Sequence, residues 1–282
     1  MSPRPARLLN PRVPALPTVS QRLLLGAAVL HGADARSSWV QWRRGGGDIE
    51  TVSPSSFCLL PLVYRNLEAN RVDDPDIPRL KGVYRHAWVM NQRLARRLER
   101  AIEALEREGI PTMTLGGPAV SAVHYRDAGA RRIDDVGVLV PPVQAQRAVT
   151  VLRADGWSPL RRVDPGRILR SGHAMPLVEP GGAQMDLQWR AFPESNSDED
   201  FWSGAVAATL GAAVTLAPGP TEQLLHACAY GVRAGPDALM WIADAAVILH
   251  TAEKEIDWAR LVDGAARREL ARTTGAALAI LR

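Results

Sequence analysis

Cysteine is nearly absent from this chain: Cys58 and Cys228 are the two in 282 residues. Both lie among apolar neighbours, and neither has further cysteines or histidines at the spacing that a zinc site requires. We therefore expect two buried free thiols, with a single disulfide as the alternative that the sequence leaves open. Free thiols are typical of a reducing compartment, and we predict a cytoplasmic protein.

Long hydrophobic runs are also lacking. No apolar segment approaches the roughly 18 residues that a membrane-spanning helix needs. The apolar segment 23–30 follows a long stretch that contains five prolines, unlike the compact basic region of a signal peptide. The sequence therefore predicts no membrane partner.

Lysine is scarce as well. Lys81 and Lys254 are the two lysines, so the net charge of +4 comes almost entirely from arginine. The arginines are interspersed with glutamate and aspartate along the predicted helices, which favours solvated helix faces with i,i+4 pairs. Nucleic-acid binding through these arginines is left open as one hypothesis, and it would require a steep salt dependence of affinity.

The predicted elements are ordered as helices, a small α/β core, and helices again. This order predicts an α+β fold in which a small mixed β-sheet is flanked by N-terminal and C-terminal helical regions. The expected segments are a disordered Pro/Arg-rich tail at 1–18, helices at 19–109 (the clearest at 92–108), the core at 110–200, and helices at 201–282.

A glycine turn opens the core. Gly116 and Gly117 follow a short apolar run, and Pro118 suits the first turn of a helix that comes next. The backbone N–H groups of such a turn, together with a helix N-terminus, can bind the phosphates of a nucleotide. An ordinary chain reversal is the other interpretation.

Two acidic residues lie on predicted strands further along. Asp135 lies on the exposed face of a strand whose alternate residues are Val136, Val138 and Val140, and Asp186 lies on the second strand of a hairpin whose turn is at 179–182. Strand alternation places Asp186 on the face of Gln184 and Gln188. Carboxylates that converge from two strands can hold divalent cations for phosphoryl transfer. The plainer interpretations are an arginine pair for Asp135 and an exposed strand position for Asp186.

These residues give the chain a resemblance to a family. It is similar to the uncharacterised branch of the nucleotidyltransferase superfamily, which has a polymerase-β-like core. The matching segments are Leu115-Gly116-Gly117 for the turn, Arg131 for an arginine, Asp135 for the first acid, Leu139-Val140 for the strand end, Asp186 with Trp189 for the later strand, and the outlying segments 60–67 and 241–244. The resemblance covers most residues from about 20 to 265.

The resemblance implies transfer of a nucleoside monophosphate from a nucleoside triphosphate to an acceptor, which would be a small molecule, a protein or an RNA end. By analogy, Asp135 and Asp186 are the catalytic residues and the ligands of one or two Mg²⁺ ions. Gly116, Gly117 and Arg131 would bind the nucleotide, and Asp186 would be the base.

Three positions depart from the pattern of this family. Gly137 stands where the second acid of Asp-x-Asp is expected, Gly116 where lysine is common, and Gln188 where histidine precedes the tryptophan. A β-bulge at Asp134-Asp135 is one way to supply a second carboxylate. The alternative function is a catalytically weakened protein that keeps the fold to bind a nucleotide or a partner protein.

Overall fold

The computed structural model describes residues 16–134, 136–161, 165–233 and 238–281. Most of the expected N-terminal tail and Asp135 itself lie outside the described residues. The helices are α1 Val19–Val29, α2 Gly32–Arg44, α3 Pro54–Phe57, α4 Leu60–Ala69, α5 Ile77–Arg107, α6 Gly117–Val120, α7 Ala145–Ala154, α8 Pro165–Ser171, α9 Glu199–Ser203, α10 Pro220–Arg233, α11 Met240–Ala252, α12 Trp258–Arg267 and α13 Ala271–Ile280. A π-helix, Ser121–Tyr125, continues α6.

One mixed sheet forms the centre of the molecule, in the order β3-β4-β5-β2-β1-β7-β6. Its strands are β1 Met113–Leu115, β2 Gly137–Leu139, β3 Ser158–Pro159, β4 Ala174–Val178, β5 Gln184–Gln188, β6 Val206–Leu210 and β7 Ala213–Ala217. The pairs β2–β5 and β1–β7 are parallel, and the other pairs are antiparallel. This arrangement confirms the predicted α+β fold with a mixed sheet.

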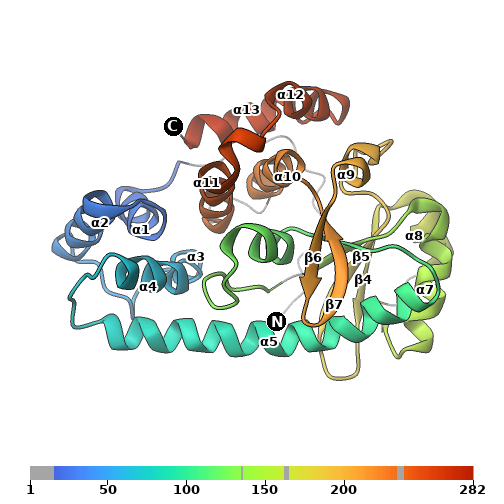
Figure 1. Ribbon diagram of the computed structural model, residues 1–282, viewed down its shortest axis with the longest axis horizontal. Coiled ribbons are helices and arrows are strands. Elements are labelled where there is room, and N and C mark those ends of the chain that lie inside the picture. The colour runs from blue at the N-terminus through green and yellow to red at the C-terminus, as the bar shows by residue number, and fades with distance from the viewer. Residues whose placement is uncertain (1–15, 135, 162–164, 234–237, 282) are drawn as a thin grey trace.

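Helices cover both faces of the sheet (Figure 1). On one face, α5 and α7 pack through Leu98, Ile102 and Leu152 against the alternate residues of β2 and β5. On the other face, residues of β1 and β2 join α10 in a second cluster around Phe192. Because strand side chains alternate, the residues of β5 between the buried ones face this second side.

The N-terminal helices do not form a separate core. Trp39 of α2 and Leu67 of α4 belong to the same buried cluster as Trp241 of α11. The first and last parts of the chain are thus joined by a shared apolar interior, with the sheet beside them.

Two elements differ from the sequence predictions. Helix α5 begins at Ile77 rather than 92 and is 31 residues long, with Pro78 in its first turn, where proline is tolerated. Strands β6 and β7 form a hairpin at 206–217, which the sequence analysis assigned to the C-terminal helices. These strands extend the core sheet through the parallel β1–β7 pair.

No helix in the described part of the chain is both long and apolar enough to cross a membrane.

Candidate nucleotide site

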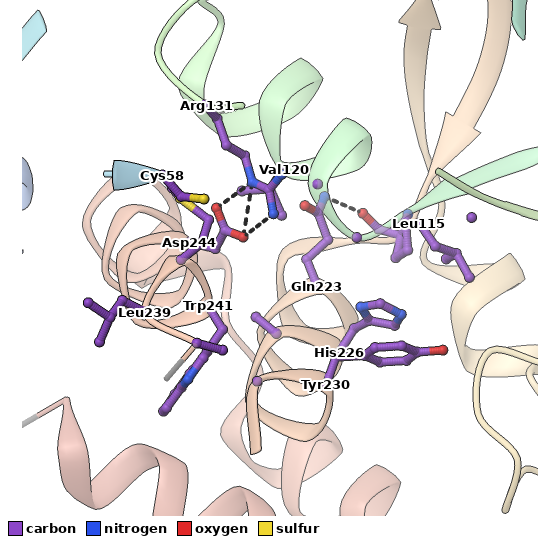
Figure 2. Close-up of a pocket in the computed structure, with 18 of the residues that line it drawn as sticks. Cys58, Leu115, Val120, Arg131, Gln223, His226, Tyr230, Leu239, Trp241 and Asp244 are labelled. Atoms are coloured by element: carbon purple, nitrogen blue, oxygen red, sulfur yellow. Dashed lines mark hydrogen bonds and ion pairs between the residues drawn. The ribbon is translucent and has the colours of Figure 1, made fainter. Parts of the chain in front are cut away.

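A pocket of about 290 Å³ opens on the second face of the sheet, between the strand ends and helices α10 and α11. Its lining includes Gly116, Gly117, Arg131 and Asp186, four residues that the sequence analysis selected, together with Gly137. Segments that are far apart in the sequence therefore meet at one cavity. Figure 2 shows its helical wall, with Gln223, His226 and Tyr230 on one helix and Trp241 and Asp244 on another.

The glycine turn has a backbone that only glycine adopts readily. Gly116 has φ +63° and ψ −134°, a conformation that strains any residue with a Cβ atom. A Cβ atom there would meet His226 Cε1 at 3.6 Å, an ordinary contact, so conformation rather than space disfavours a side chain. The backbone of this turn therefore favours the glycine that this chain has at position 116.

Arg131 packs directly on the turn. A Cβ atom added to Gly117 would lie 2.0 Å from Arg131 Nη1 and 2.6 Å from Cζ, so the guanidinium lies on the surface that glycine leaves bare. Gly117 is therefore required for the position of Arg131. Phosphate contact by the turn itself remains a prediction.

A buried carboxylate holds this arginine in place. Asp244 of α11 accepts hydrogen bonds from Arg131 Nε at 2.8 Å and from Nη2 at 2.8 Å (Figure 2). Tyr125 Oη donates to the same carboxylate at 3.0 Å, and burial, followed by the charge of Asp244, raises the pKa of Tyr125 well above its usual value. The charge of Arg131 is thereby balanced inside the protein. The sequence analysis quoted Asp244 within a matching segment but assigned it no role in the site.

A side chain of α5 holds the segment before β2 through hydrogen bonds to its backbone. Asn91 Nδ2 donates to the carbonyl oxygens of Ala128 and Arg131, each at 2.7 Å, and its Oδ1 accepts from the Ile133 N–H at 3.0 Å. Next to this segment, Arg132 pairs with Asp134 at 2.6 Å on the surface. The backbone that carries Arg131 is therefore held by three hydrogen bonds from one buried side chain of α5.

Asp186 lies where strand alternation predicts. Its neighbours Met185 and Leu187 are buried in the cluster under α5 and α7, whereas Asp186 is half-buried and lines the pocket. It is paired in register with Gly137 on the parallel strand β2. The distance to Asp135 is not defined, because that residue lies outside the described part of the chain. The convergence of the two acids remains a prediction.

Gln188 is a pocket residue that the sequence analysis placed on the face of Asp186 and named as a departure from the family, but to which it assigned no role. It is 5% exposed, and its Oε1 atom is buried without a hydrogen-bond partner. A Cβ atom at Gly137 would lie 2.9 Å from Gln188 Nε2, so its amide occupies the space beside that glycine. Only the pairing of β2 with β5 reveals this proximity.

The opposite wall of the pocket is largely apolar and aromatic. The rings of His226 and Tyr230 stack with their centroids 4.4 Å apart and their planes inclined by 18°. Trp241 packs on the bare backbone of Gly231, where a Cβ atom would lie 2.0 Å from the indole. The pocket therefore combines polar side chains at the sheet with a helical wall on which Gln223, His226 and Asp244 lie among apolar and aromatic residues.

The residues on the pocket floor fit a magnesium ion in part. Among the residues that the structure describes, no group of three or more His, Cys, Asp or Glu side chains could hold a metal ion. Asp186 and Gln188 nevertheless line one cavity, the buried Gln188 Oε1 atom has no hydrogen-bond partner, and oxygen atoms are the ligands that Mg²⁺ prefers. Because Mg²⁺ keeps waters and takes phosphate oxygens, a few protein ligands suffice.

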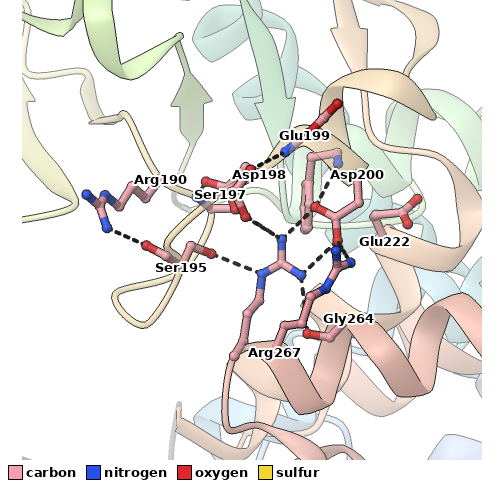
Figure 3. A network of polar contacts seen from close by, with 12 residues as sticks. Arg190, Ser195, Ser197, Asp198, Glu199, Asp200, Glu222, Gly264 and Arg267 are labelled. Carbon is pink, nitrogen blue, oxygen red and sulfur yellow. Dashed lines mark hydrogen bonds and ion pairs between the residues drawn. The ribbon is translucent and has the colours of Figure 1, made fainter.

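A second polar cluster, away from this pocket, has a structural role (Figure 3). Arg268, at the C-terminal end of α12, is 2% exposed and bonds Ser195 Oγ at 3.0 Å and Asp200 Oδ1 at 2.6 Å. Its guanidinium also lies 5.5 Å from the ring centroid of Phe192. Burial raises the pKa of Asp200, but its bonds to Arg268 outweigh this effect and lower it. The cluster fastens the loop after β5 to the C-terminal helices.

Solved structures and one family model match the chain, whereas the curated proteins do not. Among solved structures, lincosamide antibiotic adenylyltransferase LnuA, lincomycin-bound, is 15% identical over 45% of this chain and 82% of its own, with a TM-score of 0.35. The antibiotic-resistance factor ANT(2'')-Ia is 14% identical over 68% of this chain and 96% of its own, with a TM-score of 0.45. The family model described as uncharacterised nucleotidyltransferase matches residues 58–282, and because this is most of the sequence, the chain belongs to that family.

Proposed function

We propose that this protein transfers a nucleoside monophosphate from a nucleoside triphosphate to an acceptor hydroxyl, in the presence of Mg²⁺. The observation that carries the proposal is that the glycine turn, Arg131, Gly137 and Asp186 line one pocket. The acceptor class stays open between a small molecule, a protein and an RNA end, and the predicted location is the cytoplasm.

In this reaction an acceptor oxygen attacks the α-phosphorus, and the bond from that phosphorus to the bridging oxygen breaks, so that pyrophosphate leaves. The proton of the acceptor hydroxyl passes to a carboxylate, for which Asp186 is the candidate among the described residues. Asp135 is proposed from the sequence as its partner. When bound, the metal ion neutralises charge on the phosphates and stabilises the entering and leaving oxygens. The protein positions the nucleotide, with the glycine turn as the phosphate contact.

The charges that line the pocket predict how nucleotide affinity depends on Mg²⁺. Among the described residues, the charged side chains that line it are those of Arg131, Asp186 and Asp244, and Arg131 is paired with Asp244. A triphosphate that enters alone meets no excess positive charge. We therefore expect nucleotide affinity to depend strongly on Mg²⁺, by tenfold or more, an effect of about 1.4 kcal/mol or more.

The test uses each of the four nucleoside triphosphates labelled at the α-phosphate, incubated with Mg²⁺ and candidate acceptors of the three classes. We expect a labelled product that disappears in Asp186→Ala and Asp135→Ala. Asp155→Ala is the matched control, because Asp155 is an exposed carboxylate at the end of α7. Product formation that persists in Asp186→Ala would remove this residue from the mechanism.

The alternative is a module that binds a nucleotide or a partner protein without transfer. It is favoured by one observation, that Gly137 supplies no carboxylate to the strand beside Asp186. Calorimetry with each nucleotide, with and without Mg²⁺, separates the two functions when it is combined with the transfer assay. Metal-dependent binding with no labelled product from any acceptor would favour the binding module.

A further inference from the structure

Gly137 and Gln188, two departures from the pattern of the family, lie next to each other in the site. Gly137 and Asp186 are register partners on the parallel strands β2 and β5, and Gln188 follows two positions later on the face of Asp186. The Gln188 Nε2 atom lies 2.9 Å from where a Gly137 Cβ atom would be. An aspartate at position 137 would thus enter the volume that the Gln188 amide fills. Where β2 lacks an acid at Gly137, the amide of Gln188 on β5 therefore fills the space.

The amide oxygen of Gln188 makes no hydrogen bond within the described part of the protein. Its Oε1 atom is buried without a partner in a side chain that is 95% enclosed, since 5% of its surface is exposed. Leaving such an acceptor unsatisfied destabilises a protein, because the hydrogen bonds that it made to water are lost. The oxygen also belongs to a residue that lines the pocket beside Asp186. Both facts indicate that its partner arrives with a ligand.

We propose that Gln188 replaces the missing second acid by presenting its amide oxygen to the divalent cation that accompanies the nucleotide. The inference rests on the proposed function for the identity of that ligand. An amide oxygen is an accepted ligand of hard cations but carries no charge. The exchange of carboxylate for amide therefore lowers the negative charge of the site by one.

This charge difference predicts how the cation binds. Without nucleotide, Asp186 and a neutral amide provide weak attraction for a divalent ion, so the free protein binds the ion poorly. With nucleotide, the phosphate oxygens provide the remaining ligands. The site thus becomes selective for the metal–nucleotide complex over the free metal.

The test measures Mn²⁺ binding directly, from the loss of the electron paramagnetic resonance signal of the free ion, with and without a non-hydrolysable nucleoside triphosphate. Gln188→Glu restores the charge at the same place, and we expect about tenfold tighter Mn²⁺ binding by the nucleotide-free protein, the lower end of effects seen around metal sites. Gln188→Met keeps the unbranched shape and removes the oxygen, and we expect about tenfold weaker Mn²⁺ binding in the nucleotide complex.

Matched controls are Gln146→Glu and Gln146→Met, because Gln146 is an exposed residue of α7 outside the pocket. A second readout is the unfolding temperature without ligand. Gln188→Met should unfold at the same temperature as the wild type or higher, because an unsatisfied buried acceptor is removed. A lower temperature with unchanged Mn²⁺ binding would show that the amide only supports the fold.

The outcomes also separate this inference from the proposed function. Mn²⁺ binding that responds to both Gln188 variants, without transfer to any acceptor, would support the metal role of Gln188 and reject the enzyme. Transfer activity with Mn²⁺ affinities equal in wild type, Gln188→Glu and Gln188→Met would support the enzyme and reject the role of Gln188. A wild-type protein that binds no Mn²⁺ in either state would also reject that role.

Discussion

The ion pair between Arg131 and Asp244 gives the sharpest prediction about the site. Asp244→Ala removes the carboxylate that accepts three hydrogen bonds from Arg131, at 2.8, 3.1 and 2.8 Å, and one from Tyr125. The side chains of the pair are 11% and 6% exposed, so little of the arginine charge is hydrated once its partner is lost. An arginine charge is then left buried on the backbone of Gly117.

The magnitude follows from burial. Breaking a buried ion pair by removing one partner costs about 3–5 kcal/mol, because the remaining charge is uncompensated. We therefore expect the free energy of unfolding to fall by about 3–5 kcal/mol in Asp244→Ala. At about 2–4 °C for each kcal/mol in a chain of this size, the unfolding temperature should fall by about 6–20 °C.

Urea denaturation followed by circular dichroism measures this loss. The control is Asp134→Ala, which removes the carboxylate that pairs with Arg132, the residue next to Arg131. That pair is 43% and 56% exposed, so its loss should cost less than about 1 kcal/mol. Replacing both buried partners, with Arg131→Met and Asp244→Leu, should recover much of the stability. Equal losses in Asp244→Ala and Asp134→Ala would refute the argument from burial.

Three further predictions concern other contacts. Gly117→Ala places a Cβ atom 2.0 Å from Arg131 Nη1 and should displace the guanidinium, with a loss of about 3 kcal/mol in urea denaturation. Arg268→Ala removes the buried partner of Asp200 and leaves it only the exposed Arg267, and it should cost about 3–5 kcal/mol, measured in the same way. Burial lowers the pKa of His124 to about 4, below its value of 6.5 when unfolded, so the unfolded chain binds the extra proton between these values. Stability should therefore fall by about 1–3 kcal/mol as the pH drops from 6.5 to 4, and this part of the slope should vanish in His124→Asn.

Each of these changes has a comparison within the chain. Gly275→Ala, on α13, introduces a Cβ atom that meets nothing within 4 Å and should leave stability unchanged or slightly higher. Arg272→Ala removes an exposed arginine of the same helix and should cost less than about 0.5 kcal/mol. If Gly117→Ala behaves like Gly275→Ala, or Arg268→Ala like Arg272→Ala, the packing argument is wrong. An unchanged pH slope in His124→Asn would contradict the role of that residue.

Local patterns were sufficient to predict the central hairpin and the faces of its second strand. The turn at 179–182 joins β4 to β5, and the alternation of Met185, Asp186 and Leu187 is that of a strand with one buried face. Both predictions depend on residues that are neighbours in the sequence. The resemblance to the family, which the match over 58–282 confirms, added the order of the segments.

The missed hairpin shows where local patterns mislead. Strands β6 and β7 are rich in alanine, which favours helices over strands, so the sequence analysis expected helices there. Their structure depends on a two-residue turn in which Gly211 has φ +65°, and on the pairing of β7 with β1. The second of these contacts joins residues about a hundred positions apart. No local pattern contains it.

The same limitation applies to the site. Arg131 and Asp244 are separated by 113 positions, and their pair exists because α11 packs beside the glycine turn. The contact between Gln188 and Gly137 requires the register of two strands. The sequence could therefore suggest which residues carry charge, but not which of those charges the fold already neutralises.

The length of α5 has a mechanical consequence. Its 31 residues form a rod about 46 Å long, at 1.5 Å for each residue. Leu80 near one end packs with the N-terminal helices, Leu98 and Leu105 near the other end lie under the sheet, and Asn91 between them holds the strand approach to the pocket. Because a continuous helix resists bending, α5 keeps the N-terminal helices, the sheet and the backbone of Arg131 at fixed positions relative to one another.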